Sequence, residues 1–263
     1  KFQVMTVLSS GFRNPNIDDI GKIRENNGIL VVPNTFLKPE YAYNLDLGIN
    51  YKSLNELTYL SLRTFATVIS RHIVRDDFII FSDNTTPDES TILYNGEEVT
   101  TIANKNLGNR FIHGYSIDGF SYFSRSLKLN GSLSYVKGDE NETYGPMPSI
   151  SPIFGTISGE YTKDKIKISA LYKFSGDKSP KDYSLGGEDG LEETPVITEN
   201  SNGIIYAGTP KWSDFSIYTN YDISEDVKIR IALTNIFDNH YRTFASGISA
   251  PGRSFQIGLY LKL

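Results

Sequence analysis

The last ten residues of the chain, SFQIGLYLKL (254–263), alternate strictly between two kinds of side chain. Odd positions carry the apolar residues Phe255, Ile257, Leu259, Leu261 and Leu263, whereas even positions carry polar, small or amphipathic residues. Successive side chains of a β-strand point to opposite faces of the sheet. The stretch therefore predicts a strand with an apolar face and a polar face.

The same alternation recurs along the chain, in residues 45–51, 127–135, 165–174 and 227–234, and about ten candidate strands can be counted. Several candidates reach about ten residues. Strands of soluble sheets average about 5–6 residues, whereas strands that cross an outer membrane need about 9–11. No apolar run approaches the ~18 residues of a membrane-spanning helix. The lengths therefore favour strands that span a membrane.

The connections between the candidate strands alternate in size. Tight polar turns are expected at Ser53–Glu56, Arg125–Ser126, Lys163–Asp164 and Ser224–Asp226, and long segments at about 11–40, 76–110, 137–154, 175–212 and 238–252. Short turns at one rim and long loops at the other are typical of a transmembrane β-barrel. We therefore expect an all-β fold, in which residues 1–263 form one single-domain segment of an antiparallel up-and-down transmembrane barrel.

The amino-terminal end indicates that this barrel is larger than the sequence. Lys1 already lies in an apparent strand, so the first strand has no partner on one side. An open sheet edge in hydrocarbon leaves backbone N–H and C=O groups unpaired, at a cost of several kcal/mol each. We therefore expect the chain to be the carboxy-terminal part of a longer, closed barrel.

Several sequence boxes resemble those of one family, the TonB-dependent outer-membrane receptors. The resemblance is carried by Gly11–Asn16 (GFRNPN), Pro33-Asn34, Leu37–Glu40 (LKPE) and Tyr43–Gly48, and near the end by Asn235–Asp238, Tyr241-Arg242 and Ala250–Phe255. The first group is similar to the Phe-Arg-x-Pro and Asn-x-x-Leu-Lys-Pro-Glu boxes of that family. The resemblance implies a 22-stranded barrel around an amino-terminal plug, with the last ten strands present and the plug absent.

The resemblance also implies a function, a location and partners. The chain would be the barrel portion of a receptor for energised uptake of a scarce nutrient through the bacterial outer membrane, and a ferric siderophore-type complex is the leading cargo. Its partners would be outer-membrane lipid, the barrel-insertion machinery, the small-molecule ligand, and a TonB-type energy-coupling protein that acts through the plug. Nucleic acid is not expected, because the formal net charge is −5.

Candidate ligand contacts lie in the 11–40 segment, which we expect to overhang the lumen. They are Arg13, Asn14, Asn16, Arg24 and Asn34. Arg242 and Arg253 are further candidates, although charged residues at a barrel rim more often pair locally or meet water. The ligand itself is left open by the sequence.

No catalytic constellation, metal site or cofactor site is expected. The chain has no Cys, and its three histidines (His72, His113 and His240) lie in different segments without metal-ligand spacing. Acidic residues gather in residues 76–98, with seven carboxylates and no Lys or Arg, and in residues 177–211. The pattern lacks the spacing of a calcium loop, which favours solvated loops over Ca²⁺ binding.

Other interpretations remain open at this point. The cargo of the receptor could be a glycan, a peptide, cobalamin or haem, although the 11–40 segment has no histidine to serve as an axial ligand. The chain could also be an outer-membrane barrel enzyme, such as a protease or phospholipase. A third class is a soluble secreted β-protein that binds glycans on aromatic faces.

Overall fold

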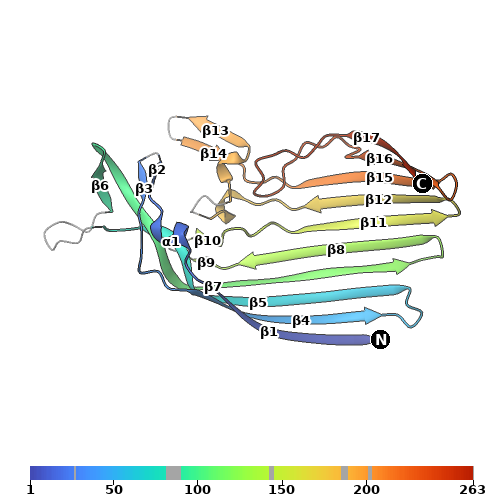
Figure 1. Ribbon diagram of the computed structural model, residues 1–263, viewed down its shortest axis with the longest axis horizontal. Coiled ribbons are helices and arrows are strands. Elements are labelled where there is room, and N and C mark those ends of the chain that lie inside the picture. The colour runs from blue at the N-terminus through green and yellow to red at the C-terminus, as the bar shows by residue number, and fades with distance from the viewer. Residues whose placement is uncertain (27, 81–89, 142–144, 185–188, 201–202, 263) are drawn as a thin grey trace. The chain divides into compact units, whose positions relative to one another are not determined.

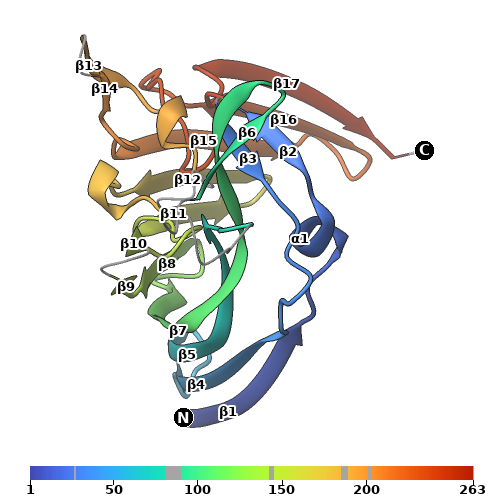
Figure 2. The ribbon, with the colours of Figure 1, turned by 90° about the vertical axis from the view of Figure 1, so that its left-hand side faces the viewer.

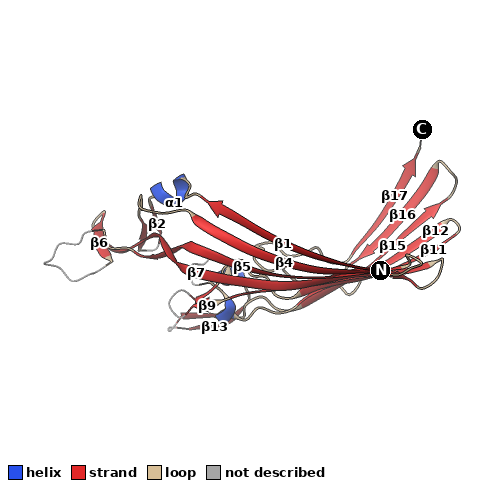
Figure 3. Cartoon of the chain, turned by 90° about the horizontal axis from the view of Figure 1, so that it is seen from below, coloured by secondary structure: helices blue, strands red, loops and turns tan. Residues whose placement is uncertain are grey.

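The computed structural model describes the whole chain except residues 27, 81–89, 142–144, 185–188, 201–202 and 263. The chain divides into two compact units, one made of residues 1–7, 46–66 and 112–263 and the other of residues 8–45 and 67–111. Figure 3 shows that strands predominate. No helix of the described part is long and apolar enough to cross a membrane.

Ten strands follow one another as hydrogen-bonded neighbours in one sheet. In order they are β1 (Phe2–Arg13), β4 (Glu40–Lys52), β5 (Thr58–Asp77), β7 (Glu97–Tyr122), β8 (Leu127–Gly138), β11 (Phe154–Lys163), β12 (Ile166–Ser175), β15 (Trp212–Asp222), β16 (Val227–Thr234) and β17 (Ser254–Leu261). From β7 onward each successive pair is antiparallel. The predicted succession of about ten antiparallel strands is confirmed.

The pairing register of the first unit gathers apolar side chains on one face. Directly opposite residues of an antiparallel pair share a face, and the register of β16 and β17 pairs Val227 with Leu261, Ile229 with Leu259, Ile231 with Ile257 and Leu233 with Phe255. The four residues from β17 are 60–68% exposed. No second layer of protein covers this face among the described residues of the strand, which is the arrangement expected of a surface against lipid. Leu263 lies outside the described residues.

The same face continues across the neighbouring strands, which run side by side in Figure 1. It includes Tyr115 and Ile117 of β7, Leu129 and Leu133 of β8, Ile157 and Tyr161 of β11, Ile168 and Tyr172 of β12, and Phe215 and Ile217 of β15. The apolar surface therefore extends from β7 to β17, because the register of each pair between these strands preserves the alternation.

The opposite face is polar and is crossed by side-chain pairs. Lys173 of β12 lies 3.4 Å from Asp214 of β15, and Lys167 pairs with Glu160. Ser132 and Thr156 share a hydrogen bond of 2.7 Å. In a barrel this face lines the interior, where water and polar ligands are accommodated.

Short turns join the strands at one end of the first unit. They lie between β4 and β5, β7 and β8, β11 and β12, and β15 and β16, at the four predicted positions. In the tightest of them Asp164 has a left-handed backbone (φ 50°), which Asp tolerates better than most residues. The predicted turns are confirmed.

The second unit contains a small packed core. Leu30, Val32, Val99 and Ala103 are buried together, with Phe78, Ile92 and Tyr94 packed against them. The core forms where β3 (Ile29–Val31) pairs in parallel with β7, while β6 (Thr91–Tyr94) pairs antiparallel with β7 and β2 (Arg24–Asn26) pairs with β3. Figure 2 shows β2, β3 and β6 beside β7. Parts of the expected loop segments 11–40 and 76–110 thus form β-structure.

The remaining elements lie in the segments of the chain that connect the strands of the sheet. They are α1 (Ile17–Gly21), the hairpin of β9 (Glu140–Asn141) and β10 (Gly145–Pro146), the 3₁₀ turns Pro180–Asp182 and Leu191–Glu193, and the hairpin of β13 (Val196–Asn200) and β14 (Gly203–Tyr206). Among the described residues no group of three or more His, Asp or Glu is placed to hold a metal ion. Asp83, Asp88, Glu89 and Glu188 of the acidic segments lie outside the described residues.

A charge on the apolar face tests the assignment of that face to lipid. Ile257→Arg should destabilise the barrel in lipid vesicles by about 2–4 kcal/mol, because the guanidinium would enter hydrocarbon. Gln256→Arg places the same group on the polar face and should cost far less. Urea unfolding of the vesicle-inserted receptor measures both values, and equal costs would contradict the assignment.

Candidate ligand-binding site

Arg13 stands at the end of β1 within a network of carboxylates. Its Nε donates to Glu40 at 2.6 Å and its Nη1 donates to Asp19 at 2.8 Å. Asn16 caps helix α1, because its side chain accepts from the Asp19 backbone N–H while the Asp19 carboxylate accepts from the Asn16 N–H, both at 2.9 Å. Arg13 and Asn16 are thus brought together at Asp19.

The other predicted contacts are distributed differently. Asn34 is 9% exposed and donates to the carbonyl of Asn104 at 2.8 Å, and the Asn104 amide in turn donates to the carbonyl of Asp19 at 3.1 Å. Asn14 is exposed between β1 and α1, and Arg24 is exposed on β2. Asn16 and Asn34 therefore hold the segment in shape, while Arg13, Asn14 and Arg24 keep exposed surface for a ligand.

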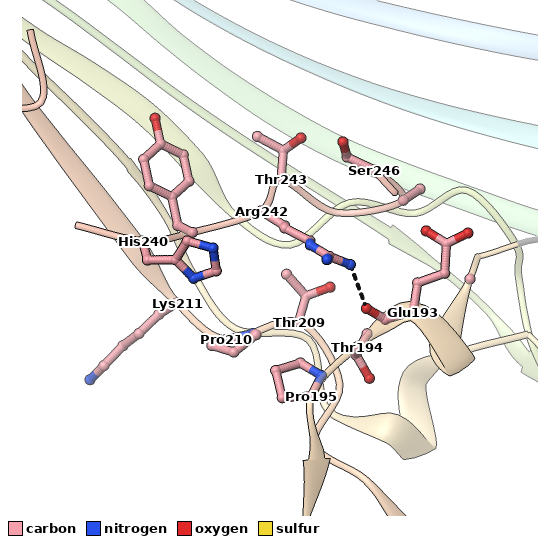
Figure 4. Close-up of a pocket in the computed structure, with 13 residues that line it drawn as sticks. Glu193, Thr194, Pro195, Thr209, Pro210, Lys211, His240, Arg242, Thr243 and Ser246 are labelled. Atoms are coloured by element: carbon pink, nitrogen blue, oxygen red, sulfur yellow. Dashed lines mark hydrogen bonds between the residues drawn. The ribbon is translucent and has the colours of Figure 1, made fainter. Parts of the chain in front are cut away.

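A pocket of about 330 Å³ lies between two loops of the first unit, residues 190–211 and 240–246. Figure 4 shows Glu193 and Lys211 of the first loop and His240 and Arg242 of the second among its lining residues. Five hydroxyl side chains also line it, from Thr194, Thr209, Tyr241, Thr243 and Ser246. Basic and hydroxyl groups in one small concave site suit an anionic or polyhydroxylated ligand.

Arg242 ties the two loops of this pocket together. Its Nη1 donates to the backbone carbonyl of Glu193 at 2.9 Å, the dashed line of Figure 4, and its Nε donates to Ser249 at 3.3 Å. Arg242 was predicted from the sequence as a possible ligand contact, whereas Lys211, His240 and Thr209 were not. Their only sequence signal is a position in segments rich in Gly, Pro and charged residues.

A buried ion pair stabilises the loops behind the pocket. Lys178 and Asp189 have side chains that are 5% and 2% exposed, and they lie 3.1 Å apart. Lys178 Nζ also donates to the carbonyl of Ile150 at 2.7 Å, and the Asp189 carboxylate accepts from the N–H of Ser149 at 2.7 Å. The pair therefore joins the 137–154 loop to the 175–212 loop.

Lys178 reaches both walls of the pocket without lining it. Its backbone N–H and C=O pair with those of Thr209, at 2.9 and 3.1 Å. Its ammonium lies 4.1 Å from the ring centre of Phe244. In the sequence Phe244 stands between Thr243 and Ala245, which both line the pocket. A cation over an aromatic face is attracted to it, so Lys178 positions the 238–252 loop as well.

Tyr241 forms an aromatic wall where the pocket meets the sheet. Its ring stacks on Trp212, with ring centres 4.3 Å apart, and its hydroxyl donates to Asp214 at 3.0 Å. Burial and this carboxylate raise the pKa of Tyr241 to about 12. The phenol is therefore a fixed neutral donor at physiological pH.

Asn235 fixes the start of the 238–252 loop. It is 2% exposed and adopts a left-handed backbone (φ 47°) that Asn tolerates. Its amide donates to the carbonyls of Asn239 (2.9 Å) and Pro251 (3.0 Å). The Asp238 carboxylate accepts from the N–H of Arg253 at 2.7 Å. The boxes near the end of the sequence thus contain residues that shape this loop.

Removing the ammonium of Lys178 should loosen three loops at once. Lys178→Met leaves the Asp189 carboxylate buried and unpaired, which costs roughly 3–5 kcal/mol in comparable sites. Hydrogen exchange in residues 176–211 and 239–250 of the full-length receptor should accelerate. Lys178→Met with Asp189→Leu should exchange more slowly than the single variant, and exposed Lys181→Met is the control. Unchanged exchange in Lys178→Met would show that the pair does not order the loops.

The raised pKa of Tyr241 predicts a pH window for stability. The tyrosine contributes stability that is fully present below its ordinary pKa of 10 and is lost as pH rises through about 12. The difference in phenolate absorbance between the wild type and Tyr241→Phe should show a group titrating near the upper value. In Asp214→Asn the same group should titrate at lower pH. A difference titration centred at 10 would refute the buried, hydrogen-bonded phenol.

Comparison with known proteins shows where this architecture occurs. Residues 3–236 match the family model described as TonB dependent receptor-like, beta-barrel. A curated relative is the probable TonB-dependent siderophore receptor PirA of Acinetobacter baumannii, which is 20% identical over 239 residues, covering 88% of this chain and 31% of the relative. The chain therefore spans about a third of the length of that relative.

Solved structures show the same fold at low identity. The structure of PirA from A. baumannii has a TM-score of 0.73 at 19% identity, covering 99% of this chain and 39% of that one. The ferric enterobactin receptor PfeA of Pseudomonas aeruginosa, as an R480A/Q482A mutant, gives 0.73 at 17% identity with 99% and 38% coverage. The copper transporter OprC gives 0.68 at 16% identity with 99% and 37% coverage.

The family match settles the class of the protein. The family is one of outer-membrane transport receptors and not of enzymes, so the barrel-enzyme and soluble glycan-binding interpretations are rejected. The alternating strands, the lipid-exposed apolar face and the match over residues 3–236 agree with one another: the chain belongs to the β-barrel domain of the TonB-dependent receptors.

Proposed function

We propose that this chain forms part of the barrel wall of a receptor that imports a ferric siderophore-type iron complex across the outer membrane. The observation that carries the proposal is the two-faced sheet of the receptor family, in which a polar, hydrogen-bonded face is available to line a passage. Two relatives are named as siderophore or ferric enterobactin receptors. Uptake would be driven by a TonB-type partner acting through a plug.

Ligand capture would involve basic groups at the loop ends of the strands. A ferric siderophore of the catecholate class carries net negative charge, which basic side chains attract. The exposed Arg13 and Arg24 of the 11–40 segment, with Asn14, offer such groups. The pocket beside Lys211, His240 and Arg242 offers a second set. Asn16 and Asn34 would act by holding the first segment in place.

Copper is a second candidate cargo. One structure with this fold is named as a copper transporter, so the barrel architecture accommodates a different metal cargo. Selectivity between the two rests on loop side chains rather than on the sheet, because the sheet supplies the wall common to the family.

The site proposal is tested by binding of ferric enterobactin to the full-length receptor. Arg13→Ala combined with Arg24→Ala should weaken binding roughly tenfold or more, because charge-assisted hydrogen bonds are each worth about 1.5–3 kcal/mol. Arg125→Ala, in the short turn between β7 and β8, is the control and should leave the affinity unchanged.

Two outcomes would count against the proposal. If the double variant binds ferric enterobactin like the wild type, the 11–40 residues are not ligand contacts. If the wild-type receptor binds no ferric siderophore but retains a copper salt, the iron-complex assignment fails and the copper alternative takes its place.

A further inference from the structure

An aromatic cluster ends the apolar face at the side of the long loops. Tyr172 of β12 lies opposite Phe215 of β15 in the register. Tyr172 stacks with Phe174, and Phe215 stacks with Phe237, each with ring centres 6.0 Å apart. Phe237 is 69% exposed. Exposed aromatic rings at the end of a membrane-spanning sheet mark the interface between hydrocarbon and water.

A hollow of about 600 Å³ opens beside this cluster. Its walls include Tyr172 and Phe174 from the apolar face, and Lys211 and His240 from the loops just beyond the strand ends. One hollow therefore contacts both the apolar surface and the basic groups of the rim. This juxtaposition requires no part of the 11–40 segment.

Three polar side chains of the hollow have unused hydrogen-bonding capacity, whereas Ser175, Asn239 and Tyr241 already donate hydrogen bonds. Within the described part of the chain, the side chains of Lys211 and His240 take part in no hydrogen bond or ion pair. The Nε1–H of Trp212, which also lines the hollow, is buried without an acceptor there. Among the described residues no carboxylate lines the hollow. Asp214 accepts from the hydroxyl of the lining residue Tyr241 at 3.0 Å, and Glu193 lines the adjoining pocket. Unpaired hydrogen-bond donors and the ammonium of Lys211 together favour an anionic ligand in this hollow.

We propose that this hollow binds the phosphate group of a membrane lipid. The phosphate would contact Lys211 and His240 at the height of the headgroups, while the acyl chains lie over Tyr172, Phe174 and the apolar face. A soluble anion would use the basic wall alone, whereas a lipid uses both walls. The proposal rests on the membership of an outer-membrane family and on the assignment of the apolar face to lipid. Because Lys211 and His240 also line the pocket considered for the cargo, lipid and cargo would compete for these two side chains.

The test compares two lipids that share their acyl chains. The full-length receptor in neutral detergent is titrated with a phosphatidic acid and with the matching diacylglycerol, which lacks the phosphate group, and bound lipid is counted by native mass spectrometry. The wild type should retain the phosphatidic acid at least tenfold more strongly. Lys211→Ala with His240→Ala should remove this preference, whereas the control Lys181→Ala, an exposed lysine of the same loop, should keep it.

A second pair of measurements separates lipid from free phosphate. Tyr172→Ser with Phe174→Ser should weaken retention of phosphatidic acid, and inorganic phosphate should compete poorly with the lipid in the wild type. Equal retention of phosphatidic acid by the wild type and the Lys211/His240 variant would overturn the site. Effective competition by inorganic phosphate would overturn the lipid assignment, since the aromatic wall would then have no role. Thermal unfolding of each variant verifies that the barrel is intact.

Discussion

The backbone of a strand in hydrocarbon can satisfy its N–H and C=O groups only through neighbouring strands. This constraint determines most of what the molecule contains. It requires long strands in unbroken succession, and each strand must then carry lipid-compatible side chains on alternate positions. The register of β16 with β17, in which Ile231 faces Ile257, shows the result: two independent sequence patterns are aligned so that one face stays apolar throughout. Stability therefore comes from backbone pairing and lipid contact, with little conventional core in the barrel strands.

Beyond the strand ends the constraint no longer applies, and the loops depend on individual buried groups. In the first unit the buried pair of Lys178 and Asp189 joins the loops, because the Lys178 ammonium contacts three chain segments. Asn235 performs a similar role at the start of the 238–252 loop. In the second unit the core around Leu30 and Val99 is apolar, and the buried Thr101 hydroxyl lies within hydrogen-bond distance of the backbone carbonyls of Phe78 and Ser90, so its single hydrogen is shared or alternates between them. Loops ordered in this way present binding groups in fixed positions, which reduces the entropic cost of capturing a ligand.

The sequence predicted the features that depend on period and spacing. The ten strands, the four short turns and the lipid-facing side of β17 follow from alternation and from polar turn residues, which are local signals. Residues 91–110 were expected to lie in a loop, but they form the four-residue strand β6 and the first part of the 26-residue strand β7. The partner of β7 there is the three-residue strand β3, which is distant in sequence, so no local pattern marks the pairing. Lys178 and Asp189 are eleven positions apart and belong to no periodic pattern, so their pairing needed the fold. The pocket at Lys211 and His240 is formed by segments separated in sequence by a strand pair, and no local motif marks it.

The central claim, that lipid covers one face of this sheet and water the other, is tested most directly by scanning β17 with spin labels. The chain contains no Cys, so single cysteines at positions 254–261 can each carry one nitroxide without background. In the vesicle-inserted receptor, labels at 255, 257, 259 and 261 should be accessible to oxygen, which concentrates in hydrocarbon. Labels at 254, 256, 258 and 260 should be accessible to a water-soluble nickel chelate instead. A profile without this period of two, or nickel access at all eight positions, would contradict the account.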